Sequence, residues 1–406
     1  MASASLSGPR LGSGRTTPPP GWELARGSGW LSWPVSRCAM RMRTRERAEA
    51  VGTFGGIVGN ETALRLLETA LRTGEVSHAY LFHGSPGVGK WTVALRFGAA
   101  LVAGGDPSAE NRALRGLHPD LTEVLPEGAF TTIGQVREVI RLASSRPFEG
   151  ARRVLVLQAD TLNVQAANAL LKTLEEPVGE TVFLLVVTSR EGVLPTILSR
   201  AQAVRFNPVP AGVVARFLEG RGADEPALAA ALGRGSVGLS LRYAEDQEFG
   251  ELREAVFEAG FAFSEDFEGR HGAVQGIVDR AEAVGAARER EVLAGFEEQD
   301  RRAKDGAKRA ARAARDGAVR ESLHLLALLY RDAGVVGAGA EELVANADRI
   351  AEIKGRVEEH PGADWAGAAL VLGEARTALA YNVSPEAILE VALSRIRRKI
   401  LEPSPG

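Results

Sequence analysis

The segment from Gly84 to Thr92 contains residues of the types that bind phosphate. It reads Gly-Ser-Pro-Gly-Val-Gly-Lys-Trp-Thr and follows a short apolar run. Glycines let such a loop curl so that backbone N–H groups point at phosphate oxygens, and a helix that starts at the loop adds its positive end. A lysine at the end of the loop reaches the terminal phosphates. We therefore predict a nucleotide-binding loop whose contacts come from Gly84, Gly87, Gly89, Lys90 and Thr92.

The metal half of this site departs from the usual pattern. A Ser or Thr hydroxyl directly after the lysine normally holds Mg²⁺, but Trp91 occupies that position. Thr92 stands one residue further on, rotated by about 100° around a helix, so it cannot simply substitute. We predict no metal site, no firm cofactor requirement, and at most weak binding of ATP or ADP.

Hydrolysis also needs carboxylates where the next core strand ends. One carboxylate supports Mg²⁺ and the other activates the attacking water. The apolar run 154–157 instead ends in Gln158, Ala159 and Asp160. Asp160 lies beyond the usual positions, and we interpret it as a cap for the following turn. The chain is therefore not expected to hydrolyse a nucleotide efficiently by itself.

Three apolar runs predict the strands that position this loop. They cover residues 79–82, 154–157 and 182–187, and helical patterns separate them. Continuous apolar strands between helices indicate a parallel sheet covered on both faces. Helices are expected over 90–102, after the capping box of Thr132 and Gln135, and over 166–176, where Pro177 ends the last one.

Strand signals fade after Pro210, so the fold class is α/β followed by all-α. The 406 residues predict more than one domain. We expect four segments. They are an extension over 1–50, an α/β phosphate-loop domain over 51–209, short helices over 210–246, and a helical bundle over 247–406.

Composition narrows the function. The net charge of −3 predicts no general affinity for nucleic acids, so any DNA contact needs a local basic face. Cys38 is the one cysteine, which excludes disulfides and thiolate zinc clusters within the chain. No apolar run approaches the roughly 20 residues that span a bilayer, and we expect a cytoplasmic protein without a membrane partner.

Residues 1–50 differ from the rest of the chain. They contain eight arginines and a Pro18-Pro19-Pro20 run, without any periodicity that could bury a face. One interpretation is a transit peptide. The other, which we favour, is an overlong start, with translation beginning at Met40 or Met42.

Several motifs together resemble the AAA+ clamp-loader subunits of bacterial DNA polymerase III. The signature helix of that family resembles residues 166–177, and its Ser-Arg-Cys motif resembles Leu198-Ser199-Arg200-Ala201. Further similarity lies at 78–82, 118–120 and 382–385. It extends from about Phe54 to the C-terminus and is strongest between 54 and 210. The Trp91, Gln158 and Ala159 substitutions resemble the eroded sites of delta-prime subunits, whereas gamma/tau subunits carry complete ones.

The resemblance implies a particular architecture and set of partners. Members have a RecA-like AAA+ P-loop domain, a small helical lid and a helical collar, and five protomers form an arc through their collars. A delta-prime subunit lies beside a gamma/tau ATPase, and its Ser-Arg motif reaches that neighbour's ATP. The implied partners are gamma/tau and delta subunits, the sliding clamp and primer–template DNA.

Arg200 is the implied trans-acting residue, with Ser199 orienting it. An arginine offers a planar, permanently charged fork that matches phosphate oxygens. Such an arginine finger stabilises charge in the transition state of the neighbour's reaction. From spacing alone, Arg200 could equally cap a helix or pair at the surface.

The chain also departs from the family pattern. Many delta-prime subunits carry a four-cysteine zinc module after the loop helix, but residues 104–117 contain no cysteine. Ala201 replaces the cysteine of the Ser-Arg-Cys motif. Gly238 stands at the lid's phosphate-sensing arginine position, and we interpret Arg242, one turn later, as solvated or ion-paired.

Two basic features could touch DNA. Arg137 and Arg141 lie four residues apart on one helical face, and they could bind backbone phosphates or form an ordinary charged surface. Residues 301–315 hold seven basic residues against Asp305 alone. That run is either a DNA-binding arm or, as we favour, a solvated edge of the bundle.

Two other functions compete with this reading. A gamma/tau-like subunit or a related AAA+ motor would hydrolyse ATP itself, but it should show Asp-Glu where Gln158 and Ala159 stand. A P-loop kinase acting on a small molecule is more distant, because no segment resembles its substrate lid.

Overall fold

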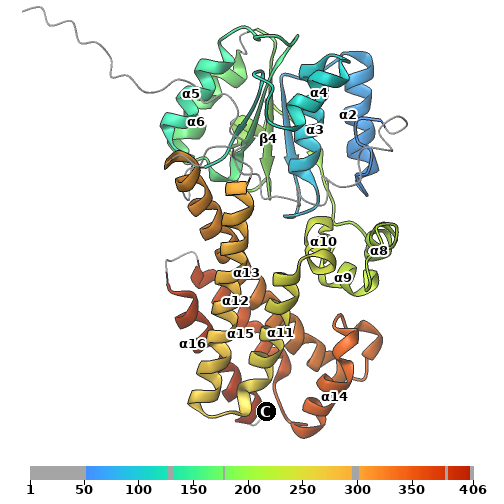
Figure 1. Cartoon of the computed structure of the whole chain (residues 1–406), viewed down its shortest axis with the longest axis vertical. Coiled ribbons are helices and arrows are strands. Elements are labelled where there is room, and N and C mark those ends of the chain that lie inside the picture. Colours follow the sequence, from blue (N-terminus) through green and yellow to red (C-terminus); the bar gives the residue numbers. More distant parts are fainter. Residues whose placement is uncertain (1–51, 127–130, 177–178, 295–300, 380–382, 403–406) are drawn as a thin grey trace, which may run out of the picture.

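The computed structural model describes residues 52–126, 131–176, 179–294, 301–379 and 383–402, without the side chains of 301–303. The N-terminal extension over 1–50 lies outside these ranges. So do Cys38, Pro177 and Asn382, on which sequence-based expectations also fell. The fold class is confirmed, because a parallel α/β unit precedes an all-helical region (Figure 1).

Five parallel strands form one sheet. Their order is β2-β3-β4-β1-β5, with bounds β1 (Ala79–His83), β2 (Leu121–Val124), β3 (Arg153–Gln158), β4 (Thr181–Val187) and β5 (Gln202–Arg205). The three central strands are the three that the sequence predicts. The two edge strands escape prediction because each is only four residues long and buries a single residue completely.

Helices cover both faces of the sheet, as predicted (Figure 1). In β4, Leu184 packs into one core and Leu185 into the other, because side chains alternate across a strand. The first core contains α2 (Glu61–Thr73), α3 (Lys90–Ala103) and part of α4 (Pro107–Leu114). The second contains α5 (Ile133–Ala143), α6 (Val164–Glu175) and α7 (Pro195–Leu198).

The start of α5 confirms the predicted capping box. The Thr132 hydroxyl accepts the backbone N–H of Gln135 at 3.2 Å, and the Gln135 side chain accepts the Thr132 N–H at 3.0 Å. Two donors that the first helical turn would leave unpaired are thereby satisfied.

Three short helices, which we call the lid helices, follow the sheet. They are α8 (Ala211–Glu219), α9 (Pro226–Leu232) and α10 (Val237–Glu245), and they share a small core around Val214 and Leu218. Figure 1 shows them as a separate unit below the sheet.

The remaining helices form a bundle with one continuous core. They are α11 (Gln247–Phe261), α12 (Phe267–Ala294), α13 (Arg301–Gly337), α14 (Ile350–Glu359), α15 (Trp365–Ala378) and α16 (Pro385–Leu401). The leucines of α13 that the sequence assigns to the core are buried, namely Leu323, Leu325, Leu326, Leu328 and Leu329. The α12–α13 hairpin rises from the bundle toward the sheet (Figure 1).

Candidate nucleotide site and arginine corner

The phosphate loop has the curled backbone that its glycines predict. Gly84, Gly87 and Gly89 have φ values of 143°, 75° and 94°, which side chains rarely tolerate. A Cβ at Gly84 would lie 2.0 Å from the carbonyl oxygen of Phe206. The loop therefore packs directly on the chain that follows β5, and only glycine fits there.

Lys90 folds back onto the loop that it terminates. Its Nζ donates to the carbonyl oxygens of Gly84 at 2.6 Å and Ser85 at 2.7 Å, and its side chain is buried. Burial lowers the pKa of Lys90 to about 8, and the nearby Asp160 carboxylate offsets part of that effect. The ammonium group thus has protein partners where a nucleotide would offer phosphate.

A lid residue also occupies the loop. Ser236 caps the start of α10 by accepting the N–H of Leu239, and its hydroxyl donates to the carbonyl of Gly87 at 3.1 Å. A Cβ at Gly87 would lie 2.0 Å from this hydroxyl oxygen. Ser236 is not among the site residues that the sequence predicts. Its position just before the helical run of 237–245 was the available signal, but that signal indicates a cap rather than a loop contact.

The position expected to hold the metal hydroxyl is filled by an indole. Trp91 packs against the core between the sheet and α3, and its Nε1–H donates to a carboxylate oxygen of Glu123 at 3.3 Å. Thr92, on the next position of α3, is half-buried. Among the described residues, no group of three or more His, Cys, Asp or Glu side chains is arranged to hold a metal ion.

The end of β3 carries no catalytic pair. Gln158 is half-buried and Ala159 is buried, so neither supplies a carboxylate. Asp160 accepts the backbone N–H of Thr188 at 2.7 Å, directly after β4. The sequence predicts that Asp160 caps the turn that follows it. This prediction is wrong, because the carboxylate accepts the N–H of Thr188 instead. Because β3 and β4 are paired in register, their ends lie side by side and the carboxylate bridges them.

Ser199 and Arg200 form a polar corner after α7. The Arg200 guanidinium donates to the Thr196 carbonyl at 2.8 Å and the Ser199 hydroxyl at 3.0 Å, and it pairs with Glu175 of α6 at 2.6 Å. The Arg200 side chain keeps 32% exposure. Both surface roles that the sequence left open, helix cap and ion pair, are thus present. Glu175 is a partner that the sequence motifs do not indicate.

Gly238 and Arg242 both belong to α10 of the lid helices. Gly238 offers no side chain there. Arg242 pairs with Asp246 at 3.3 Å and lies over the Phe249 ring at 3.8 Å from its centroid, so its expected ion-paired state is confirmed. Gly238 thus has no side chain that could bind phosphate, and Asp246 already balances the charge of Arg242.

A second polar contact ties the lid helices to the bundle. Arg234 adopts φ 51° and pairs with Glu321 of α13 through two contacts of 2.9 Å. Tyr243 donates to the same carboxylate at 2.7 Å. With Ser236 on Gly87, the segment from Arg234 to Ser236 contacts both the phosphate loop and the bundle.

Arg137 and Arg141 lie on the opposite side of the sheet from the helix that follows the phosphate loop. Both are exposed on α5, which packs on the opposite face of the sheet from α3. Arg141 pairs with Glu138 at 2.8 Å, whereas Arg137 makes no hydrogen bond or ion pair with the described part of the chain. The two arginines share a face, but only Arg137 is free of a carboxylate.

His118 and Asp120 are buried, and the Asp120 N–H donates to Nδ1 of His118 at 3.2 Å. Burial would raise the pKa of Asp120, but backbone N–H groups of Gly150, Phe148 and Glu149, and then Arg153, outweigh it and lower the pKa. The Arg153 contact measures 3.0 Å.

In the part of the chain that the structure describes, every helix is too short or too polar to span a bilayer.

Comparison with known proteins agrees with this geometry. Residues 59–210 match the family model described as DNA polymerase III, delta subunit. The delta-prime subunit of Bacillus subtilis DNA polymerase III is 30% identical over 204 residues, and that of Pseudomonas aeruginosa is 37% identical over 163. These alignments cover 48% and 37% of this chain, and 62% and 49% of the relatives. The chain thus spans half to three fifths of their length.

A tau subunit and one solved structure are also similar to this chain. The tau subunit of Bacillus subtilis is 31% identical over 164 residues, which cover 38% of this chain and 29% of that protein. A gamma subunit-related protein of Thermotoga maritima has a TM-score of 0.45 and 19% identity, covering 82% of this chain and 99% of its own. That TM-score is below 0.5. The order of the strands and the curled phosphate loop define the fold of this chain.

The parallel sheet and the curled glycine loop between β1 and α3 form a P-loop α/β domain, which helical regions follow along the chain. Within the P-loop class, the family match over residues 59–210 and the names of the relatives support a delta-prime-type subunit of DNA polymerase III. They confirm the resemblance that the sequence motifs indicate.

Proposed function

We propose that this chain is a non-hydrolysing delta-prime-type subunit of a DNA polymerase III clamp loader. It helps to load the sliding clamp onto primed DNA, and it supplies Arg200 to the ATP site of a neighbouring gamma/tau subunit. The family match over residues 59–210 and the similarity to two delta-prime subunits support the assignment.

One observation carries the non-hydrolysing part of this proposal. The groups that should face a nucleotide and its metal already have protein partners. Lys90 is bonded to loop carbonyls and Trp91 to Glu123, while Gln158 and Ala159 supply no carboxylate. A site without base and metal support loses the electrostatic means by which P-loop enzymes activate water.

The geometry at Arg200 suits a role in trans. The guanidinium is partly exposed, and Ser199 and Thr196 fix its orientation without occupying all five of its donors. Its pair with Glu175 is a surface contact, which is worth about 0–1 kcal/mol. A neighbour's phosphate could replace that carboxylate at small cost, because both present oxygen pairs to the same fork.

The proposed partners follow from the same assignment. They are gamma/tau and delta subunits, the sliding clamp and primer–template DNA, in the bacterial cytoplasm. Subunits named tau and tau/gamma are also similar to this chain, which fits subunits of shared fold assembling side by side. On α5, Arg137 is the better candidate for a phosphate contact than Arg141, whose charge Glu138 already balances.

A second candidate is a gamma/tau-like ATPase. It is favoured by the tau relatives, whose identities of 31–34% are close to those of the delta-prime relatives. The residues at the end of β3 distinguish the two candidates, since an ATPase needs acidic side chains where Gln158 and Ala159 stand.

A reconstitution with gamma/tau and delta subunits of the same bacterium tests the proposal. The purified chain alone should show negligible ATP turnover. In the assembled complex, Arg200→Ala should lower the DNA- and clamp-stimulated turnover by roughly tenfold or more, since arginine fingers contribute about 10³–10⁵ at one site. Arg205→Ala, at an exposed position of β5, is the matched control. Robust turnover by the isolated chain would exclude the non-hydrolysing role.

A further inference from the structure

One side of α13 carries an exposed concentration of positive charge. Between residues 304 and 320 the helix holds six basic residues and two acidic ones. At 100° per residue, all eight fall on the half of the helix opposite the buried alanines. The basic residues are Lys304, Lys308, Arg309, Arg312, Arg315 and Arg320, and the buried ones are Ala307, Ala310 and Ala314.

Three of these residues, which we call the basic row, follow one another at intervals of four residues without a carboxylate partner in the described chain. Lys304, Lys308 and Arg312 are exposed, and they make no hydrogen bond or ion pair with the residues that the structure describes. Arg315 differs, because Glu282 engages it at 3.1 Å and Asp316 at 2.9 Å. An arginine held in this way has less charge to offer a ligand, whereas the basic row has no carboxylate to displace.

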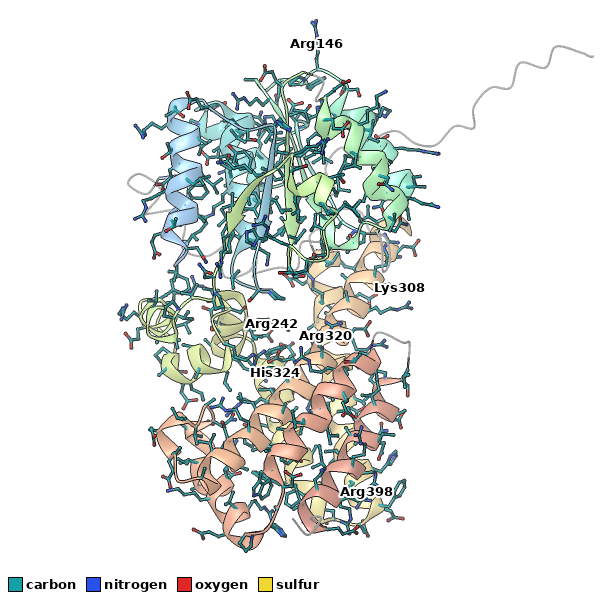
Figure 2. All side chains as sticks on the ribbon, turned by 180° about the vertical axis from the view of Figure 1, so that it is seen from behind. Arg146, Arg242, Lys308, Arg320, His324 and Arg398 are labelled. Carbon is teal, nitrogen blue, oxygen red and sulfur yellow. The ribbon has the colours of Figure 1, made fainter. Side chains whose placement is uncertain are left out.

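The basic row is linear. Its members lie four residues apart, so successive charges are separated by about 6 Å along the helix axis and turn only slowly around it. Lys308 points away from the ribbon of α13 in the view from behind (Figure 2). The charges therefore form a line along the helix surface rather than a pocket around one point.

Close packing with α12 holds this line in place. A Cβ on Gly285 of α12 would lie 3.0 Å from the carbonyl oxygen of Ala311, so the two backbones approach closely. Ala307 and Ala310 are buried on the same side of α13. Small residues on facing helices allow such an approach, and the hairpin is thereby a two-helix rod and not a loose basic tail.

We propose that the basic row binds the phosphate backbone of a nucleic-acid strand without reading its sequence. A linear polyanion fits a linear row of unpaired cations. The chain as a whole carries a charge of −3, so this surface is a local exception to its average. Residues 304–320 contain no aromatic residue that could stack on bases and no Asn or Gln that could read adenine.

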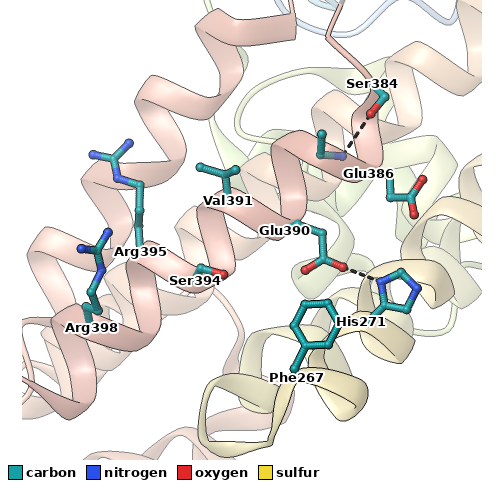
Figure 3. A pocket seen from close by; sticks show the side chains of 10 residues that line it. Phe267, His271, Ser384, Glu386, Glu390, Val391, Ser394, Arg395 and Arg398 are labelled. Carbon is teal, nitrogen blue, oxygen red and sulfur yellow. Dashed lines mark hydrogen bonds and ion pairs between the residues drawn. The ribbon is translucent and has the colours of Figure 1, made fainter.

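This surface goes beyond the proposed function, because it needs neither Arg200 nor a neighbouring subunit. It also lies on a different element from Arg137 of α5. Another hollow, between α12 and α16, is lined by Phe267, His271 and Glu390, and nothing in the structure shows what would cover it (Figure 3).

Anisotropy of labelled DNA with the purified full chain tests the basic row. Single-stranded and duplex oligonucleotides are the two probes, each from about 50 to about 200 mM salt. The test variant is Lys304→Glu/Lys308→Glu/Arg312→Glu. The matched control is Arg72→Glu/Arg216→Glu/Arg398→Glu, which reverses three exposed charges on three separate helices and gives the same net charge.

We expect the wild-type chain to bind with a slope of log affinity against log salt of about −2 to −3, from 0.7–0.9 per phosphate contact. The test variant should lose at least about tenfold in affinity at low salt and most of that slope, while the control stays within about threefold. Lys308→Gln, the milder change, should reduce the slope by about 0.7–0.9. Far-ultraviolet circular dichroism verifies that each variant is folded.

Three outcomes would overturn the proposal. They are absence of DNA binding at low salt, equal behaviour of the test and control variants, and equal affinity for an oligoglutamate of matched charge. The last would indicate an acidic protein partner. None of them bears on ATP turnover in the complex, so a failure here is distinct from a failure of the Arg200 role.

Discussion

The phosphate loop and the arginine corner treat their cations in opposite ways. Lys90 is buried, bonded to two backbone carbonyls and shifted in pKa, while Ser236 closes over the adjoining Gly87. Arg200 is partly exposed and held by one surface carboxylate and two neutral oxygens. The first cation is used within the fold, and the second remains free to exchange partners.

Under the proposed function, this difference lets a P-loop fold contribute an arginine to a complex without hydrolysing a nucleotide itself. Trp91, Gln158 and Ala159 supply neither a metal-binding hydroxyl nor a carboxylate. Contacts of the phosphate loop with Lys90 and Ser236 stabilise its closed form instead. The corner after α7 has no such competition, since its contacts stay local to α6 and α7. A phosphate loop closed by internal contacts and a partly exposed arginine therefore coexist in one domain.

The largest effect is expected where the closed loop meets the sheet. Gly84→Ala should lower the free energy of unfolding by about 2–4 kcal/mol, because the new Cβ meets the Phe206 carbonyl at 2.0 Å with φ at 143°. Urea unfolding measures it. Gly250→Ala, in open space on α11, is the control and should be neutral or stabilising by up to about 1 kcal/mol. A loss below about 1 kcal/mol at Gly84 would mean that the loop is not closed on Phe206.

An intermediate effect is expected from the pKa of Lys90. Its folded value of about 8 lies below its usual value of 10.5, so between these pH values the unfolded chain binds more protons than the folded one. Stability contributed through this group therefore rises as the pH increases across that window. Between pH 7.5 and 9.5, the unfolding free energy of the wild type should gain about 1–2 kcal/mol relative to Lys90→Met. A constant difference would show that Lys90 is solvated, like an ordinary surface lysine.

The smallest effect is expected at the corner. Glu175→Gln should change stability by less than about 1 kcal/mol, because the Arg200 pair is partly exposed. In the assembled complex it should leave stimulated ATP turnover unchanged or raised, since Arg200 loses a competitor. A large drop in turnover would instead assign Glu175 a role in holding Arg200 in its working position.

The sequence predicts local and strongly patterned features best. The central strands β1, β3 and β4 are apolar on both faces, so their burial is visible in the chain itself. The edge strands β2 and β5 are not, because pairing with a neighbour defines them more than their own residues do. The Thr132 capping box is equally local.

Contacts between distant residues are what the sequence could not supply. Trp91 was identified as a substitution, but its partner Glu123 comes from β2. Ser236 meets Gly87 across 149 residues, and Glu175 meets Arg200 only because α6 and α7 pack together. The sequence shows that a metal-binding hydroxyl and two carboxylates are absent. The contacts that Trp91, Ser236 and Arg200 make instead depend on tertiary packing.

The most direct test sets the two cations against each other in one complex. Lys90→Met and Arg200→Ala would each be assembled with gamma/tau and delta subunits, and clamp- and DNA-stimulated ATP turnover would be measured. The two-region account predicts that Lys90→Met stays within about twofold of the wild type, while Arg200→Ala falls by roughly tenfold or more. If Lys90→Met abolished turnover and Arg200→Ala preserved it, the nucleotide chemistry would belong to this chain's own loop, and the account would be wrong.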